Sequence, residues 1–201
     1  MRIKYNAPTV LTFAFISAVV LVLSQTVARS LTEQWFLVPG KGNFSPSSFR
    51  NWMTLFTHVL GHKDWLHLVS NFSIILLVGP ILEEIYGSFS LFIMICITAF
   101  VTGLLNILFF NSMLLGASGV VFMMILLASF TNFNKGEIPL TFILILILYL
   151  GKEFFDSFGN AAGAGDSISH FAHIVGGFIG SLFGFFRRRK QWDRSHSYTG
   201  V

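Results

Sequence analysis

The sequence predicts an all-α membrane protein, a six-transmembrane-helix bundle with both termini in the cytoplasm. Hydrophobic residues make up 54% of the 201 residues and charged residues only 11%, whereas a water-soluble domain carries about 25% charged residues. Long apolar runs recur along the chain, and a bilayer needs about 20 apolar residues per helix. This composition excludes a disordered chain, a nucleic-acid-binding protein and an ordinary water-soluble enzyme.

Six apolar runs define the predicted transmembrane helices, within a single membrane domain that covers residues 1–201. We interpret the first run as a retained helix rather than a cleaved signal peptide, because it exceeds the usual hydrophobic region of about 7–15 residues. The lone cysteine, Cys96, allows no disulfide within the chain. The runs are residues 9–27, 66–82, 89–110, 113–130, 138–150 and 170–186.

Positive charge predicts the orientation of these helices. Arg2 and Lys4 lie in the amino end, residues 1–8, and the basic tail at residues 187–201 has a single acid, Asp193. Because Lys and Arg favour the cytoplasmic side of a membrane, both ends are expected there. An even number of spans is then required, and six satisfies it.

The connections on the outer side are unequal. Residues 28–65 contain three tryptophans and are expected to form a long loop in the membrane interface. Residues 157–169 are rich in Gly and Ala, which favours an outer flap. The third and fourth runs are separated only by Asn111 and Ser112, so their outer link is predicted to be short.

Four polar side chains are expected at one depth, just below the outer surface. His67 and Asn71 are four residues apart in the second run, Ser118 lies near the start of the fourth, and His173 lies near the start of the sixth. These three spans all run from outside to inside, so their first turns share one layer. Polar groups at membrane depth are costly, and each needs a partner or a cavity. Glu83 and Glu84, at the inner end of the second run, are expected to form a structural cap with Tyr86 and Gly87.

This set of side chains matches the needs of acyl transfer. The hydroxyl of Ser118 is a weak nucleophile until a base takes its proton, and the imidazole of His173 titrates near neutral pH. Hydrogen-bond donors for the tetrahedral intermediate are available from His67, Asn71 and the backbone near Ser118. Asp166 is a possible third member, but nothing in the spacing requires one, so a Ser-His dyad is predicted.

Small residues surround both members of the predicted dyad. Gly116 and Gly119 flank Ser118, while Gly176 and Gly180 fall on the helix face of His173. Faces without side chains let two helices approach closely, which a hydrogen bond from serine to imidazole requires.

Other interpretations of these residues stay open at this point. An intramembrane serine often bonds back to its own helix, and glycines at such spacing often serve packing alone. A metal site is the alternative for His58, His62 and His67, but the sequence offers only Asp64 as an acidic neighbour. No metal and no cofactor are therefore expected, and His58 and His62 are instead expected to hold the outer segment, residues 28–65, in place through hydrogen bonds.

These motifs resemble those of the rhomboid intramembrane serine proteases, in their minimal six-helix bacterial form. The resemblance covers residues 49–186 and includes a turn of the form Glu83-x-x-x-Gly87. It rests on His67-x-x-x-Asn71, Gly116-Ala117-Ser118-Gly119 and Ala172-His173-x-x-Gly176-x-x-x-Gly180.

The resemblance implies a fold and an activity. Ser118 would be the nucleophile, His173 the general base, and His67 with Asn71 the oxyanion site. The partners would be membrane-protein substrates, cleaved near the outer boundary of a bacterial cytoplasmic membrane, and the lipid bilayer, with no nucleic acid. The family's adjacent Trp-Arg in the outer loop is replaced here by Met53 and Thr54, and its frequent Tyr after the serine is Phe122.

Two other classes of function are weighed against the protease. A non-catalytic rhomboid-like scaffold would bind membrane proteins for quality control, but such scaffolds typically lack the serine or the histidine. A transporter or channel would place polar residues along the whole depth of a pathway, whereas here the inner halves of the runs are almost wholly apolar.

Overall fold

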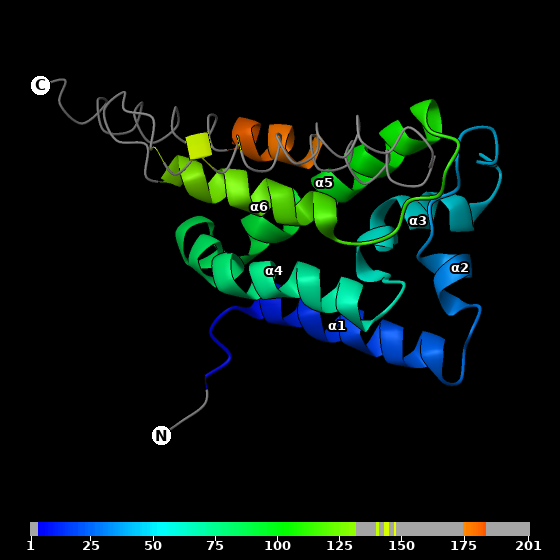
Figure 1. The fold of residues 1–201 in the computed structure, drawn as a ribbon, viewed down its shortest axis with the longest axis horizontal. Helices are drawn as coiled ribbons and strands as arrows, with labels where there is room; N and C mark the ends of the chain where they lie inside the picture. Colours follow the sequence, from blue (N-terminus) through cyan, green and yellow to red (C-terminus); the bar gives the residue numbers. More distant parts are fainter. Residues whose placement is uncertain (1–3, 132–139, 141–142, 145–146, 148–174, 184–201) are drawn as a thin grey trace, which may run out of the picture.

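A computed structural model describes residues 4–131, 140, 143–144, 147 and 175–183. Within these residues the regular structure is helical (Figure 1). A helical segment at residues 175–183, orange in Figure 1, follows six α-helices and one 3₁₀ helix. In chain order those elements are α1 (Pro8–Gln25), α2 (Leu31–Trp35), α3 (Phe49–Thr57), the 3₁₀ helix η1 (His58–Leu60), α4 (Trp65–Tyr86), α5 (Ser88–Phe109) and α6 (Ser118–Thr131).

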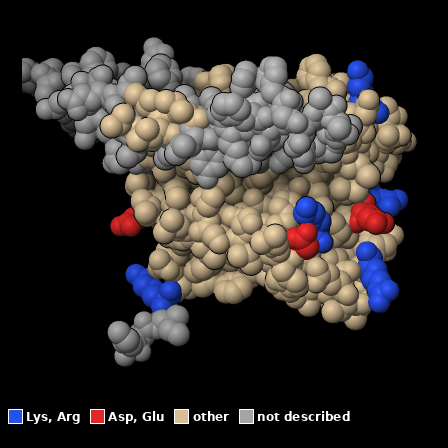
Figure 2. Space-filling view, viewed as in Figure 1, with Lys and Arg blue, Asp and Glu red and all other residues tan. Residues whose placement is uncertain are grey.

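Three of the helices, α1, α4 and α5, are long and apolar enough to cross a membrane. They match the first three predicted runs closely. Most of the fifth predicted run and half of the sixth lie outside the described residues, as do the predicted flap at 157–169 and the tail at 187–201. On the face drawn in Figure 2, charged side chains gather toward the two ends of α1 and α4, and uncharged residues cover the middle.

Helix α4 occupies the centre of the described fold, because it packs against α1, α5 and α6. Its buried residues include Ile75 and Leu82, which join the main hydrophobic core. Gly79 lets α1 come close, since a Cβ atom there would lie 2.7 Å from a methyl group of Val10. This arrangement places the first turns of α4 beside the start of α6.

A buried carboxylate joins the end of α4 to the start of α1. The two oxygens of Glu83 accept hydrogen bonds from the backbone N–H groups of Thr9 and Val10, at 2.8 and 3.0 Å. These N–H groups lie in the first turn of α1, where the helix itself provides no acceptor. Glu83 thus caps another helix, which accords with the structural role expected at this end of the span. Gly87, with φ +83°, then turns the chain into α5.

The fourth predicted run differs from the structure at its start. Helix α6 begins at Ser118 rather than Met113. The residues before it are extended, because Leu114 exchanges two backbone hydrogen bonds of 3.0 Å with Val38. Leu114 is apolar because it packs in a small buried cluster with Val38 and Leu55, not because it belongs to a helix. The outer link is accordingly longer than the predicted Asn111 and Ser112.

The outer segment at residues 28–65 folds back against α5. Helix α3 packs on α5 where Gly103 leaves room, since a Cβ atom at Gly103 would lie 3.2 Å from Leu55. The 3₁₀ helix η1 reaches about halfway along α5, where the His58 ring meets the carbonyl oxygen of Ala99 at 3.1 Å. This segment therefore extends well below the carboxyl-terminal end of α5 and carries polar groups to the start of α6.

We predict that Glu83→Gln destabilises the fold. The amide keeps one acceptor oxygen but turns an NH₂ group toward the second N–H of α1, and an unsatisfied buried donor costs about 1–3 kcal/mol. Thermal or denaturant unfolding in detergent measures the loss. Glu84→Gln is the matched control, because the neighbouring Glu84 is exposed and should leave stability unchanged. Equal effects of the two substitutions would contradict the capping role.

Candidate active site

Ser118 is the first residue of α6, and its side chain is partly buried. The helix starts with a hydrogen bond of 3.0 Å from the N–H of Val121 to the carbonyl oxygen of Ala117. The first N–H groups of a helix have no acceptor within the helix, and the helix dipole places partial positive charge there. The hydroxyl of Ser118 therefore stands at a position that stabilises negative charge.

Gly116 forms the turn that leads into Ser118. Its φ of +113° is a conformation that residues with a Cβ rarely adopt. A Cβ atom at Gly116 would also lie 2.6 Å from Cε1 and 2.7 Å from Nε2 of His67, and 3.8 Å from Nδ2 of Asn71. The imidazole edge and the amide of α4 thus pack against the backbone two residues before Ser118.

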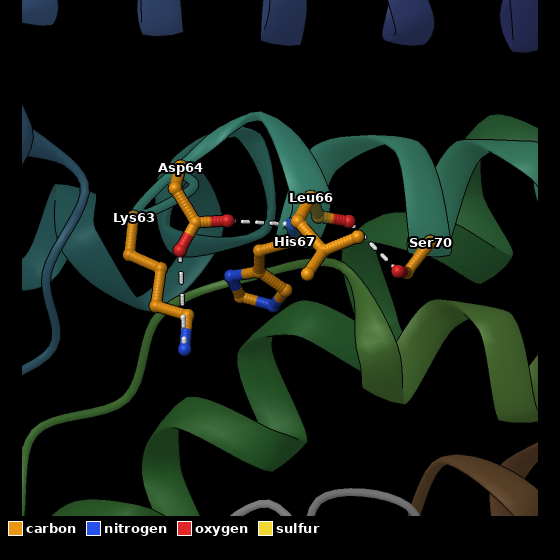
Figure 3. A network of polar contacts seen from close by, with 5 residues as sticks. All are labelled: Lys63, Asp64, Leu66, His67 and Ser70. Carbon is orange, nitrogen blue, oxygen red and sulfur yellow. Dashed lines mark hydrogen bonds and ion pairs between the residues drawn. The ribbon is translucent and has the colours of Figure 1, made fainter.

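The start of α4 positions His67. Asp64 caps the helix, because its Oδ1 accepts a hydrogen bond of 2.7 Å from the N–H of His67. Figure 3 shows the His67 ring projecting from α4 on the side away from α1, toward the green ribbons of α5 and α6. Asp64 also lies 4.0 Å from Lys63, an exposed ion pair that adds little stability.

His62 orients the side chain of Asn71. Nδ1 of His62 lies 3.3 Å from the carbonyl oxygen of Leu60, and because a carbonyl only accepts, this nitrogen carries the proton. Nε2 of His62 then accepts a hydrogen bond of 3.1 Å from the Asn71 amide. Both side chains are buried, with exposed fractions of 1% and 7%. One imidazole thereby fixes which way the amide faces.

His58 joins three parts of the structure around the site. Its Nε2 donates to the carbonyl oxygen of Ala99 on α5, at 3.1 Å. Its own carbonyl oxygen accepts a hydrogen bond of 3.0 Å from the N–H of Gly116. The turn before Ser118 is therefore tied to η1, and η1 is tied to α5.

Burial keeps His58 and His62, which lie outside the spanning helices, in their neutral forms at pH 7. Loss of solvent around each ring lowers its pKa from the ordinary 6.5 to about 4. For His62 the nearby His67 ring lowers the pKa further, and the two ring centroids are 5.0 Å apart. A neutral imidazole suits the hydrogen bonds of His62, in which Nδ1 donates and Nε2 accepts, and the single bond that His58 donates from Nε2 to Ala99.

The glycines of the predicted site lie at a close helix contact. A Cβ atom on Gly176 would overlap the carbonyl oxygen of Gly119, and one on Gly180 would overlap that of Met123. The segment at residues 175–183 therefore packs directly on α6, with Gly176 beside the residue that follows Ser118. The proposed base, His173, lies outside the described residues, as does Asp166.

The structure brings His67 and Asn71 together at Gly116, two residues before Ser118. Sequence reasoning assigned His58 and His62 only a general role in holding the outer segment, and it missed the direct bond from Asn71 to His62. No periodicity connects a loop histidine to a helix amide nine residues later. Among the described residues, no group of three His, Cys, Asp or Glu side chains is arranged to hold a metal ion.

Comparison with known proteins adds an independent observation. A model of the Rhomboid domain matches residues 50–190. The chain is 25% identical over 162 residues to Rhomboid-like protein 11, chloroplastic, of Arabidopsis thaliana, which covers 75% of this chain and 58% of the relative. It is 26% identical over 182 residues to Rhomboid protease GlpG of Serratia proteamaculans, and this match covers 89% of this chain and 60% of the relative.

A third relative has a similar degree of likeness. Rhomboid protease GlpG of Photorhabdus laumondii is 26% identical over 199 residues, which covers 97% of this chain and 64% of the relative. The match thus spans about three fifths of the length of these three relatives.

We predict that stability falls in acid because of His58 and His62. Their folded pKa of about 4 lies below the ordinary 6.5, so the unfolded chain binds protons first as the pH falls. Their contribution is fully present above about pH 6.5 and is lost progressively toward pH 4. Unfolding in detergent at closely spaced pH values measures this slope, which His58→Gln should reduce. A midpoint independent of pH across this window would contradict the prediction.

Proposed function

The chain belongs to the rhomboid family, and from this premise we propose that it is an intramembrane serine endopeptidase that cleaves transmembrane segments of other membrane proteins. The observation that carries the proposal is the position of Ser118 at the amino end of α6, next to a turn packed against His67 and Asn71. This arrangement supplies a nucleophile and donors for developing negative charge at one place.

Ser118 acts as the nucleophile and His173 as its general base in this proposal. Ser118 directly precedes Gly119, and His173 lies three residues before Gly176 in the sequence. Close approach of the two glycines is what a hydrogen bond of about 2.6–3.2 Å between hydroxyl and imidazole requires. The contact between Gly176 and Gly119 therefore supports the pairing.

The reaction proceeds through an acyl-enzyme. Oγ of Ser118 attacks the peptide carbonyl carbon while His173 takes the hydroxyl proton, which gives a tetrahedral oxyanion. His173 then gives that proton to the leaving amine as the C–N bond breaks. Water, deprotonated by the same imidazole, attacks the ester, and collapse of the second intermediate releases the acid and restores Ser118.

The oxyanion is stabilised by the N–H of Ser118, the amide of Asn71 and the ring of His67. Fixed donors aimed at developing charge are effective because they need no reorganisation during the reaction. Helix α4 and the start of α6 hold these groups on rigid elements. The bond from Asn71 to His62 supports this role, because it restricts the rotation of the amide.

The substrate must present an extended backbone to Ser118, because a helix hides its carbonyl groups in its own hydrogen bonds. Substrates with Gly, Pro or polar residues near the membrane boundary are therefore preferred. We place the cleaved bond near the outer face of a bacterial cytoplasmic membrane, with both ends of the enzyme inside. Residues 139–169 gate substrate entry in this proposal, and no cofactor takes part.

A non-catalytic scaffold is the competing function. A scaffold and a protease would both bind the transmembrane segments of other proteins, but only the protease needs a reactive hydroxyl. Labelling by a fluorophosphonate separates them, because the probe forms a bond only with an activated serine. Failure of several probes to label a folded preparation would favour the scaffold.

We predict that Ser118→Ala abolishes cleavage and labelling while the protein remains folded. The purified chain is reconstituted with a single-span substrate whose outer boundary contains Gly and Pro, and the fragments are measured. Ser129→Ala is the matched control, because Ser129 also lies on α6 but bonds only to the carbonyl of Ile125 among the described residues. Cleavage that survives Ser118→Ala would refute the assignment.

We also predict that His62 affects catalysis through Asn71. Removing one oxyanion donor lowers kcat by a factor of about 10²–10³. Asn71→Ala should therefore lower kcat by a factor in that range and leave KM little changed. His62→Ala should lower kcat by a smaller factor, and the double variant should resemble Asn71→Ala alone. Steady-state cleavage kinetics of the four proteins test this coupling. Multiplicative losses in the double variant would contradict it.

A further inference from the structure

A groove of about 370 Å³ opens between α1 and α5. Its walls are the first half of α1, from Pro8 to Ile16, and the part of α5 from Phe92 to Ala99, which ends near the middle of that helix. Val59 and Leu60 of η1 also line it. None of the lining residues comes from α4 or α6, so the groove is separate from the candidate active site.

The groove faces hydrocarbon rather than water. Both long walls belong to helices that are candidate membrane spans. From Pro8 to Ile16 the α1 wall rises about 12 Å, at about 1.5 Å per residue, which approaches half of a hydrocarbon core about 30 Å thick. The groove is thus about one leaflet deep, and η1 closes it near the middle of the membrane.

Polar groups lie only toward the end of the groove that is nearest the amino terminus. The Thr12 hydroxyl, which lines the groove, lies 2.9 Å from the Tyr5 hydroxyl. Thr9 donates to the carbonyl oxygen of Ser88 at 2.9 Å, and the exposed Lys4 precedes these residues. Beyond Thr12 the lining is apolar. The groove therefore has the polarity of a phospholipid, with a polar end at the membrane surface and an apolar end inside.

We propose that this groove is a binding site for one phospholipid, with an acyl chain between α1 and α5 beneath η1 and the headgroup beside Tyr5 and Lys4. The polarity of the groove favours a lipid over a helix. A phospholipid places its headgroup against the Tyr5 and Thr12 hydroxyls and its acyl chain against the apolar remainder of the lining, whereas an apolar transmembrane helix would cover these hydroxyls without matching them.

The bound chain touches the element that supports the candidate active site. Val59 and Leu60 form the closed end of the groove, and they belong to η1 with His58. The carbonyl of His58 holds Gly116, and that of Leu60 holds His62. A lipid in the groove therefore packs beneath both of these hydrogen bonds and fills space that would otherwise leave η1 unsupported.

Native mass spectrometry tests the site. The full chain is released from nanodiscs of phosphatidylethanolamine and phosphatidylglycerol at collision energies that remove loosely held lipid. We expect the wild type to keep one phospholipid. Cys96→Phe and Ile16→Phe place a ring in the groove and should lower the fraction with lipid about tenfold. The matched controls are Ile97→Phe and Val19→Phe, at exposed positions of the same helices outside the groove, which should keep the lipid.

Each other outcome overturns the proposal. The proposal is wrong if the wild type retains no lipid, if all variants retain lipid equally, or if a dimer appears in place of the lipid adduct. A phospholipid with a diazirine near the end of one acyl chain gives a readout that needs no substitution. Its cross-links should fall on residues 8–16 and 92–99 and disappear with excess unlabelled phospholipid, whereas cross-links spread evenly over α4 would contradict the site. These readouts measure binding, so they do not depend on whether Ser118 cleaves.

Discussion

One backbone hydrogen bond, from the N–H of Gly116 to the carbonyl oxygen of His58, holds the outer segment to the turn before α6. Away from water, an unpaired backbone group costs several kcal/mol, so both groups must be satisfied inside the protein. The same constraint explains the cap that Glu83 gives to α1 and the bond from Asn71 to His62. Each contact satisfies a polar group that the apolar surroundings would otherwise penalise, and each fixes the relative position of two elements that are distant in sequence.

The buried histidines fit this constraint because they remain neutral. A charged imidazole in the same surroundings would need a counter-charge, and burial instead lowers the pKa of His58 and His62 to about 4. A neutral ring can donate from one nitrogen and accept at the other, which is what His62 does between Leu60 and Asn71. Desolvation thus decides the protonation state, and the protonation state decides the direction of the hydrogen bonds that position the site.

Much of the fold follows from the apolar runs, because length and hydrophobicity suffice to predict α1, α4 and α5. The capping role of Glu83 is also foreseeable, since a carboxylate at the end of a span needs donors. The start of α6 is not foreseeable, because Leu114 is as apolar in its buried bridge to Val38 as it would be in a helix. The shared depth of the first turns predicts His67 and Asn71 near Ser118, but no local pattern encodes the bond from Asn71 to His62. That contact depends on how the outer segment and α4 pack in three dimensions.

The corrected start of α6 changes the chemistry available to Ser118. Inside a helix, a serine would have its backbone N–H engaged four residues back and its hydroxyl bonded to its own helix, as the Ser129 hydroxyl is. At the first position of a helix, the N–H has no helical acceptor and meets the positive end of the dipole. That position exists only because Gly116 adopts a positive φ and leaves room for the His67 ring. A Cβ atom there would displace the ring or straighten the turn, so the glycine links the backbone shape to the donors around Ser118.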